Sequence, residues 1–123
     1  MGSLLVITGP PGAGKSTLAS AVVAGLNPSV LVEGDVFFGF LRTGAIEPWL
    51  PESNDQNTVV TAAAGAAVGE FVRGGLHVVY DGVIGPWFLD PFLRSTGLAT
   101  LDYALVLPPV DVCSRGDLVY PSL

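Results

Sequence analysis

Short hydrophobic runs, each bounded by glycine, proline, aspartate or asparagine, recur along the chain. They cover residues 4–7, 30–32, 78–80 and 103–107, and His77 comes directly before the third run. Runs of this length without polar alternation are typical of strands that are buried on both faces of a parallel sheet. We therefore expect four strands.

The stretches between these runs are long enough for helices that connect one strand to the next. Residues 15–26 carry alanine and leucine and end at a glycine and an Asn-Pro pair, and residues 53–72 begin with the N-cap candidates Ser-Asn-Asp and stop at two glycines. Residues 86–93 form a shorter candidate helix with proline in its first turn. The alternation of strand and helix predicts an α/β fold with a parallel sheet, helices on both faces and right-handed crossovers.

One segment does not fit this alternation. Residues 43–57 contain two prolines and few periodic apolar positions. We expect an irregular excursion there, a candidate for a mobile flap over a site.

Composition narrows the class of protein. The chain has 123 residues, which fits a single domain over residues 1–123, and half of them are hydrophobic. Five basic against eleven acidic side chains give a net charge of −6, so neither nucleic acid nor an anionic membrane surface is an expected partner. The longest uncharged stretch, residues 16–32, is interrupted by an Asn-Pro pair, and no membrane span or signal peptide is readable. A single cysteine excludes an internal disulfide framework, and we expect a cytoplasmic protein.

The strongest motif lies between the first expected strand and the first expected helix. It reads Gly-Pro-Pro-Gly-Ala-Gly-Lys-Ser-Thr and satisfies G-x-x-x-x-G-K-S/T, the phosphate-binding P-loop or Walker A motif. Its backbone N–H groups can surround phosphate oxygens, its lysine can reach the β- and γ-phosphates, and its serine hydroxyl can ligate Mg²⁺. A glycine-rich turn without a ligand is the structural alternative. The predicted ATP-phosphate site comprises Gly9, Pro10, Pro11, Gly12, Ala13, Gly14, Lys15, Ser16 and Thr17.

Acidic residues follow two of the expected strands, at the edge where parallel α/β sheets bind ligands. Asp81 directly follows the third run, where it can hold Mg²⁺ opposite Ser16 or can simply begin an Asp-Gly turn.

Asp35 follows the second run and is a candidate base for an acceptor hydroxyl. If the residues after it are helical, Arg42 lies two turns further along the same face and can bind the acceptor. Asp35 as an N-cap with Arg42 as a surface charge is an equal alternative, and Glu33 is a rival base.

Aromatic residues gather around these acidic loops. We expect most of them to pack in the core, namely Phe37, Phe38, Phe40, Trp49 and Phe88. Trp87, just past Asp81, is the one we expect at the edge of a substrate pocket.

Together, the phosphate loop, the Val-Glu-Gly-Asp run ending at Asp35 and the Val-Val-Tyr-Asp-Gly run carrying Asp81 resemble the small P-loop kinases. The nearest in pattern are the gluconate kinase, shikimate kinase and chloramphenicol phosphotransferase group. The resemblance covers residues 3 to 110 and implies a three-layer α/β/α fold with strand order 2-3-1-4-5. It also implies Mg²⁺-dependent transfer of the ATP γ-phosphoryl group to a small hydroxyl compound.

The resemblance also assigns roles and marks one departure. It implies that residues 9–17 bind the ATP phosphates, Asp81 the metal and Asp35 the substrate. Members of the group continue past the fourth strand into an arginine-bearing lid, a fifth strand and an adenine loop. Little chain remains here beyond the fourth strand, so we expect order 2-3-1-4, with the fifth strand missing and the domain incomplete at its C-terminus.

These observations lead to a functional hypothesis with two rivals. The hypothesis is an ATP- and Mg²⁺-dependent kinase acting on a small hydroxylated metabolite or antibiotic, with Lys15 stabilising the transferred charge and Asp35 as base. The rivals are a nucleotide-binding or hydrolysing module without a small acceptor, and an inactive kinase-derived fragment. The sequence does not indicate an oligomeric state.

Overall fold

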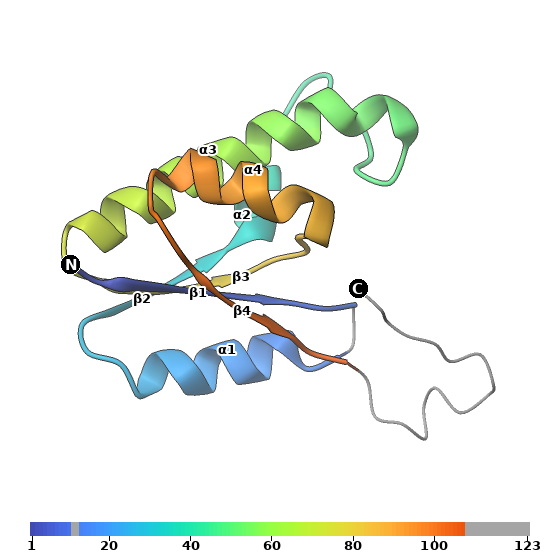
Figure 1. Ribbon diagram of the computed structural model, residues 1–123. Coiled ribbons are helices and arrows are strands. Elements are labelled where there is room, and N and C mark those ends of the chain that lie inside the picture. The colour runs from blue at the N-terminus through green and yellow to red at the C-terminus, as the bar shows by residue number, and fades with distance from the viewer. Residues whose placement is uncertain (11–12, 108–123) are drawn as a thin grey trace.

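The sheet contains four parallel strands, as expected, and the computed structural model describes residues 1–10 and 13–107 of the chain. The strands are β1 (Ser3–Thr8), β2 (Ser29–Glu33), β3 (His77–Asp81) and β4 (Asp102–Leu105). Their order is β2-β3-β1-β4, which confirms the predicted order 2-3-1-4 (Figure 1). β3 therefore lies between β1 and β2 in space, although it follows both in sequence.

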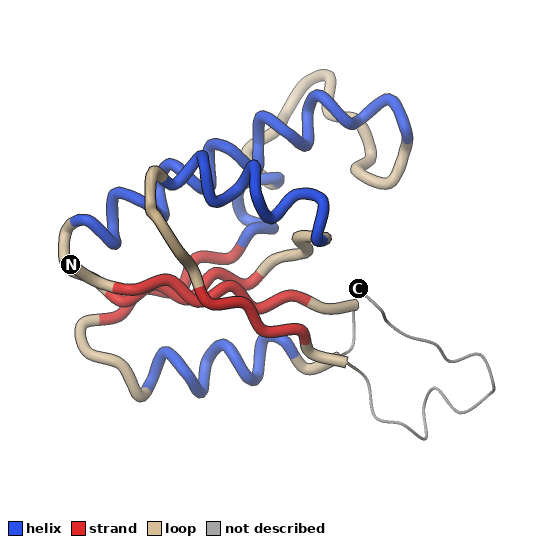
Figure 2. Tube along the Cα trace, in the orientation of Figure 1, coloured by secondary structure: helices blue, strands red, loops and turns tan. Residues whose placement is uncertain are grey.

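Helices cover both faces of this sheet. The elements between the strands are α1 (Lys15–Ala24), α2 (Gly34–Phe38), α3 (Asn54–Arg73) and α4 (Pro86–Thr96). Helix α1 lies against one face and the other three lie on the opposite face, so the predicted three-layer α/β/α arrangement is confirmed (Figure 2). No helix among residues 1–10 and 13–107 has the length and apolar character needed to cross a membrane.

Strand alternation divides the apolar side chains into two layers. On the side of α3 and α4, the buried residues are Leu4, Val6, Val32, Ala64, Val68, Val72, Val78, Tyr80, Ile84 and Phe92. On the side of α1, the buried residues are Ile7, Ala19 and Val79. Because neighbouring strand residues point to opposite faces, β1 and β3 contribute to both layers, which explains their continuous hydrophobic sequence.

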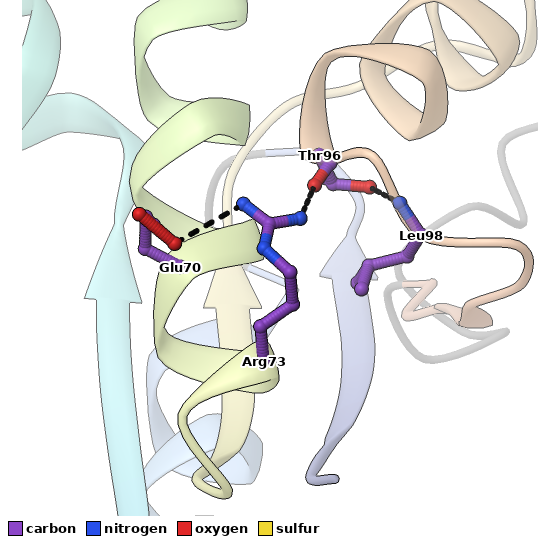
Figure 3. Close-up of polar contacts among 4 residues, drawn as sticks. All are labelled: Glu70, Arg73, Thr96 and Leu98. Carbon is purple, nitrogen blue, oxygen red and sulfur yellow. Dashed lines mark hydrogen bonds and ion pairs between the residues drawn. The ribbon is translucent and has the colours of Figure 1, made fainter.

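Helices α3 and α4 approach each other closely at two glycines of α3. A Cβ atom on Gly69 would lie 2.0 Å from the carbonyl oxygen of Thr96, and one on Gly65 would lie 1.8 Å from the Ser95 hydroxyl oxygen. The contact is completed by Arg73, which donates a hydrogen bond from Nη1 to the Thr96 carbonyl oxygen at 2.7 Å (Figure 3). An otherwise unpartnered carbonyl at the end of α4 is thereby satisfied.

The excursion expected over residues 43–57 is partly regular. A short 3₁₀ helix spans Pro51–Ser53, and α3 begins at Asn54. The side chain of Gln56 accepts a hydrogen bond from the Ile46 N–H at 2.8 Å and donates one to the Ile46 carbonyl at 2.7 Å. The backbone of the segment before α3 is thus held at Ile46 by a side chain of that helix.

Two helix predictions need correction. Helix α2 ends at Phe38, so the alternative in which Asp35 and Arg42 share one helical face is wrong. Helix α4 continues through Pro91 to Thr96, three residues past its expected end, and Phe92 within it is buried against Tyr80 with ring centroids 4.9 Å apart. Burial of a large aromatic side chain offsets the hydrogen bond that an interior proline removes.

Candidate functional site

The phosphate loop connects β1 to α1, as the sequence predicted. Gly9 has φ of 155°, and a Cβ atom there would lie 2.2 Å from the Val106 carbonyl oxygen, so only glycine fits beside β4. Gly14 has φ of 94°, a left-handed conformation that also favours glycine. Between them, the Ala13 N–H donates to the Pro10 carbonyl at 3.2 Å. Pro11 and Gly12 of the predicted site lie outside the described residues.

The first turn of α1 follows this loop and is suited to an anion. Its N-cap is Gly14, which supplies no side-chain acceptor, and the turn contains Lys15 but no acidic residue. The N–H groups at a helix start attract negative charge because they lack partners within the helix. Lys15, Ser16 and Thr17 are therefore placed as the motif requires.

The Ser16 hydroxyl meets the end of β3. Its Oγ donates to Oδ2 of Asp81 at 3.4 Å, and Asp81 is 8% exposed. In the described part of the chain, no three His, Cys, Asp or Glu side chains gather closely enough to hold a metal. A hydroxyl beside one carboxylate nevertheless fits Mg²⁺, which takes oxygen ligands and keeps several waters and substrate phosphates.

A cleft of about 260 Å³ brings the predicted site residues together at the carboxyl ends of the strands. It is lined by Lys15, Ser16, Glu33, Asp35, Asp81, Gly82 and Val83. Glu33 and Asp81 are register partners on adjacent strands, and Asp35 lies in the first turn of α2. Both candidate bases therefore reach the cleft. A larger cavity of about 440 Å³ lies at the opposite ends of β1 and β4 and contains none of these residues.

Two of the proposed substrate residues do not line the cleft. Arg42 follows the end of α2 and is exposed, and Trp87 is 76% exposed in the first turn of α4. The expected core packing is confirmed for Phe37 and Phe88 but is wrong for Phe40 and Trp49, which are 64% and 75% exposed. Beyond the end of β3, the cleft is lined by Val83 and not by Trp87.

Tyr80 is a site-adjacent residue that the sequence reasoning missed. It is 3% exposed, and the hydroxyl end of its ring lies close to two glycines that are next to the acidic residues. A Cβ on Gly34 would lie 2.6 Å from its hydroxyl, and one on Gly82 would lie 2.7 Å from Cε2. Burial, and then the negative charges of Asp35 and Asp81, raise the pKa of Tyr80 to about 12. The glycine after Glu33 and the glycine after Asp81 were the signals for this packing.

No family model matches the sequence, and a search of curated proteins finds no match. Solved structures do match. The tunicamycin resistance protein of Deinococcus radiodurans has a TM-score of 0.69 at 18% identity, covering 99% of this chain and 74% of that one. A chain of the Pnkp1/Rnl/Hen1 complex has a TM-score of 0.67 at 21% identity, covering 99% and 41%. A sugar kinase from Janibacter has a TM-score of 0.66 at 17% identity, covering 91% and 64%.

These similarities concern the fold. The chain has the fold of P-loop kinases, as the sequence resemblance implied. It spans less than two thirds of the length of the sugar kinase and of the chain from the Pnkp1 complex.

Proposed function

We propose that this chain is the nucleotide-binding part of an ATP- and Mg²⁺-dependent phosphotransferase that acts on a hydroxyl group of a small molecule. The observation that carries the proposal is the cleft in which Lys15, Ser16 and Asp81 meet Asp35. Phosphate-binding, metal-binding and proton-accepting groups are then present at one strand edge, as phosphoryl transfer requires. The kinase fold of the structural neighbours supports the same function.

The phosphate loop and α1 would bind the triphosphate. Backbone N–H groups at the start of α1 and the ammonium group of Lys15 would neutralise the charge on the β- and γ-phosphates. Ser16 and Asp81 would hold Mg²⁺, which supplies further charge neutralisation on the transferred group.

The acceptor would enter from the side of Glu33 and Asp35. Its hydroxyl oxygen forms a bond to the γ-phosphorus while the bond to the β,γ-bridging oxygen breaks, and ADP leaves. The hydroxyl proton passes to a carboxylate, for which Asp35 is the first candidate and Glu33 the second. Because both carboxylates line the cleft, the base must be identified by substituting each of them in turn.

The first experiment is a calorimetric titration of the chain with ATP in excess Mg²⁺, compared with Lys15→Ala. A charged hydrogen bond contributes about 1.5–3 kcal/mol, so the variant should bind at least about tenfold more weakly. Arg94→Ala is the matched control, because Arg94 is an exposed cation that pairs with Asp90 on α4. A folded chain that binds no ATP would contradict the proposal and favour a kinase-derived fragment.

Acceptor-dependent turnover separates a kinase from a module that only binds or hydrolyses nucleotide. The proposal requires ADP release that rises with acceptor concentration and falls in Asp35→Asn or, if Glu33 is the base, in Glu33→Gln. ADP release that is indifferent to every acceptor and to Asp35→Asn would identify a nucleotide hydrolase instead.

A further inference from the structure

The side chains that line the cleft carry more negative than positive charges. One cation, Lys15, faces three carboxylates, those of Glu33, Asp35 and Asp81. If Lys15 binds phosphate and Asp81 lies with Ser16 at the metal, Glu33 and Asp35 are the charged groups left for the acceptor.

The other basic side chains of the described residues lie elsewhere. Arg73 binds the Thr96 carbonyl and pairs with Glu70, and Arg94 pairs with Asp90 on α4. His77 lies at the first position of β3, beside Ser3, at the end opposite the cleft. Arg42 is exposed and does not line the cleft. Among the residues that the structure describes, an anionic acceptor would therefore meet carboxylates in the cleft and no arginine.

An uncharged polar group lies beside the two carboxylates. Tyr80 is 97% buried, and its hydroxyl lies against the backbone of Gly34, between Glu33 and Asp35 in sequence. This hydroxyl takes part in none of the hydrogen bonds among the described residues, and no fully enclosed polar atom there lacks a partner. Tyr80 is not itself among the residues that line the cleft, so the charged groups left for an acceptor there are Glu33 and Asp35.

We infer that the acceptor is a neutral or amine-bearing hydroxyl compound without a carboxylate or phosphate group. The inference rests on the proposed function, and it names the acceptor class of the same cleft. Hydroxyl groups of such a compound can donate to Glu33 and Asp35, and an ammonium group is attracted by both carboxylates.

Two matched series of probes test the inference. One series is glucose, glucosamine and glucuronate, and the other is phenylethanediol, phenylethanolamine and mandelate. Each series keeps its scaffold and changes the charge of one substituent. Turnover of the full chain with MgATP is measured for every probe as acceptor-dependent ADP release, and phosphorylated product is detected by mass spectrometry. The neutral or cationic members should have kcat/KM at least about tenfold above the carboxylated members.

A charge-neutralising variant provides the second measurement. Glu33→Gln should narrow the gap between neutral and carboxylated probes, while Glu47→Gln, which changes an exposed carboxylate outside the cleft, should leave the gap unchanged. A carboxylated probe that is used best, or equal use of all charges, would overturn the inference and leave the kinase proposal intact. No turnover with any probe by a chain that binds MgATP would overturn the inference and count against phosphotransfer as well. Loss of MgATP binding itself would contradict the phosphate site instead.

Discussion

The Ser16 hydroxyl lies 3.4 Å from Oδ2 of Asp81, although 65 positions separate the two residues. The sheet order explains the contact, because β3 pairs directly with β1 and Ile7 is the register partner of Asp81. The end of β3 and the start of α1 therefore meet over the edge of β1. The contact joins the residues that follow the phosphate loop to the acidic side of the cleft.

Removing the Asp81 charge should weaken nucleotide binding only when the metal is present. Asp81→Asn should lower ATP affinity by about tenfold or more in excess Mg²⁺, since charged contacts contribute about 1.5–3 kcal/mol. In EDTA the variant should bind ATP as well as the parent chain, or better, because a carboxylate near the phosphates is gone. Calorimetry in the two buffers measures this. Asp55→Asn, which changes an exposed acid on α3, is the control, and an equal loss in both buffers would assign Asp81 a purely structural role.

Asp35 should affect transfer and not nucleotide affinity. Asp35→Asn keeps the side-chain shape but accepts no proton, so acceptor-dependent kcat should fall by about 10²–10⁴-fold while the ATP dissociation constant is unchanged. Steady-state kinetics and calorimetry on the same preparation provide both values. If Glu33→Gln shows this pattern and Asp35→Asn does not, Glu33 is the base.

The raised pKa of Tyr80 predicts a loss of stability in alkali. Below the ordinary tyrosine pKa of 10.0 both folded and unfolded chains keep the proton, so the full stability is present. As pH rises from 10.0 towards about 12, the unfolded chain loses this proton before the folded chain does, and the free energy of unfolding falls. The fall approaches about 3 kcal/mol over this window.

Tyr80→Phe isolates this effect because the ring packing is kept. Urea unfolding between about pH 9 and pH 12 should show a shallower decline for the variant. The remaining decline includes Tyr103, whose pKa is also raised by burial. If the free energy of unfolding falls equally with pH in the two proteins, the pKa of the Tyr80 hydroxyl is not raised in the folded chain.

Close packing of α3 on α4 predicts a position-specific cost for added side chains. Gly69→Ala places a Cβ 2.0 Å from the Thr96 carbonyl oxygen, so the helices must separate, and the free energy of unfolding should fall by about 1–3 kcal/mol. Gly25→Ala is the matched control, because its Cβ has no neighbour closer than 3.6 Å. Urea denaturation at neutral pH compares them. An equal effect of both substitutions would mean that helix propensity, and not the contact, decides stability.

The parts of the structure that the sequence predicted share a local signature. The phosphate loop is a contiguous motif with its own backbone geometry, so its place after β1 follows from the residues alone. The buried strands are readable because both their faces are apolar. The order of the strands followed from the family resemblance and is confirmed.

Features that depend on distant packing were not readable. Continuing a helix from Asp35 to Arg42 required four more residues than α2 has, and a glycine directly follows Phe38. Exposure of Trp49 depends on how the excursion before α3 is attached, and the Ser53 and Asn57 side chains bind the carbonyl of the preceding Pro48. Tyr80 was read as one more apolar strand residue, because its role depends on a glycine at the start of α2 and another just after β3.

The ring of Tyr80 limits the side chains that Gly34 and Gly82 can be replaced by. The start of α2, which carries Asp35, and the loop that follows Asp81 both pack against this one side chain. A substitution at one glycine that displaces the ring therefore also changes the space at the other. Substitutions at the two glycines should therefore be strongly non-additive, with the second costing far less than the first.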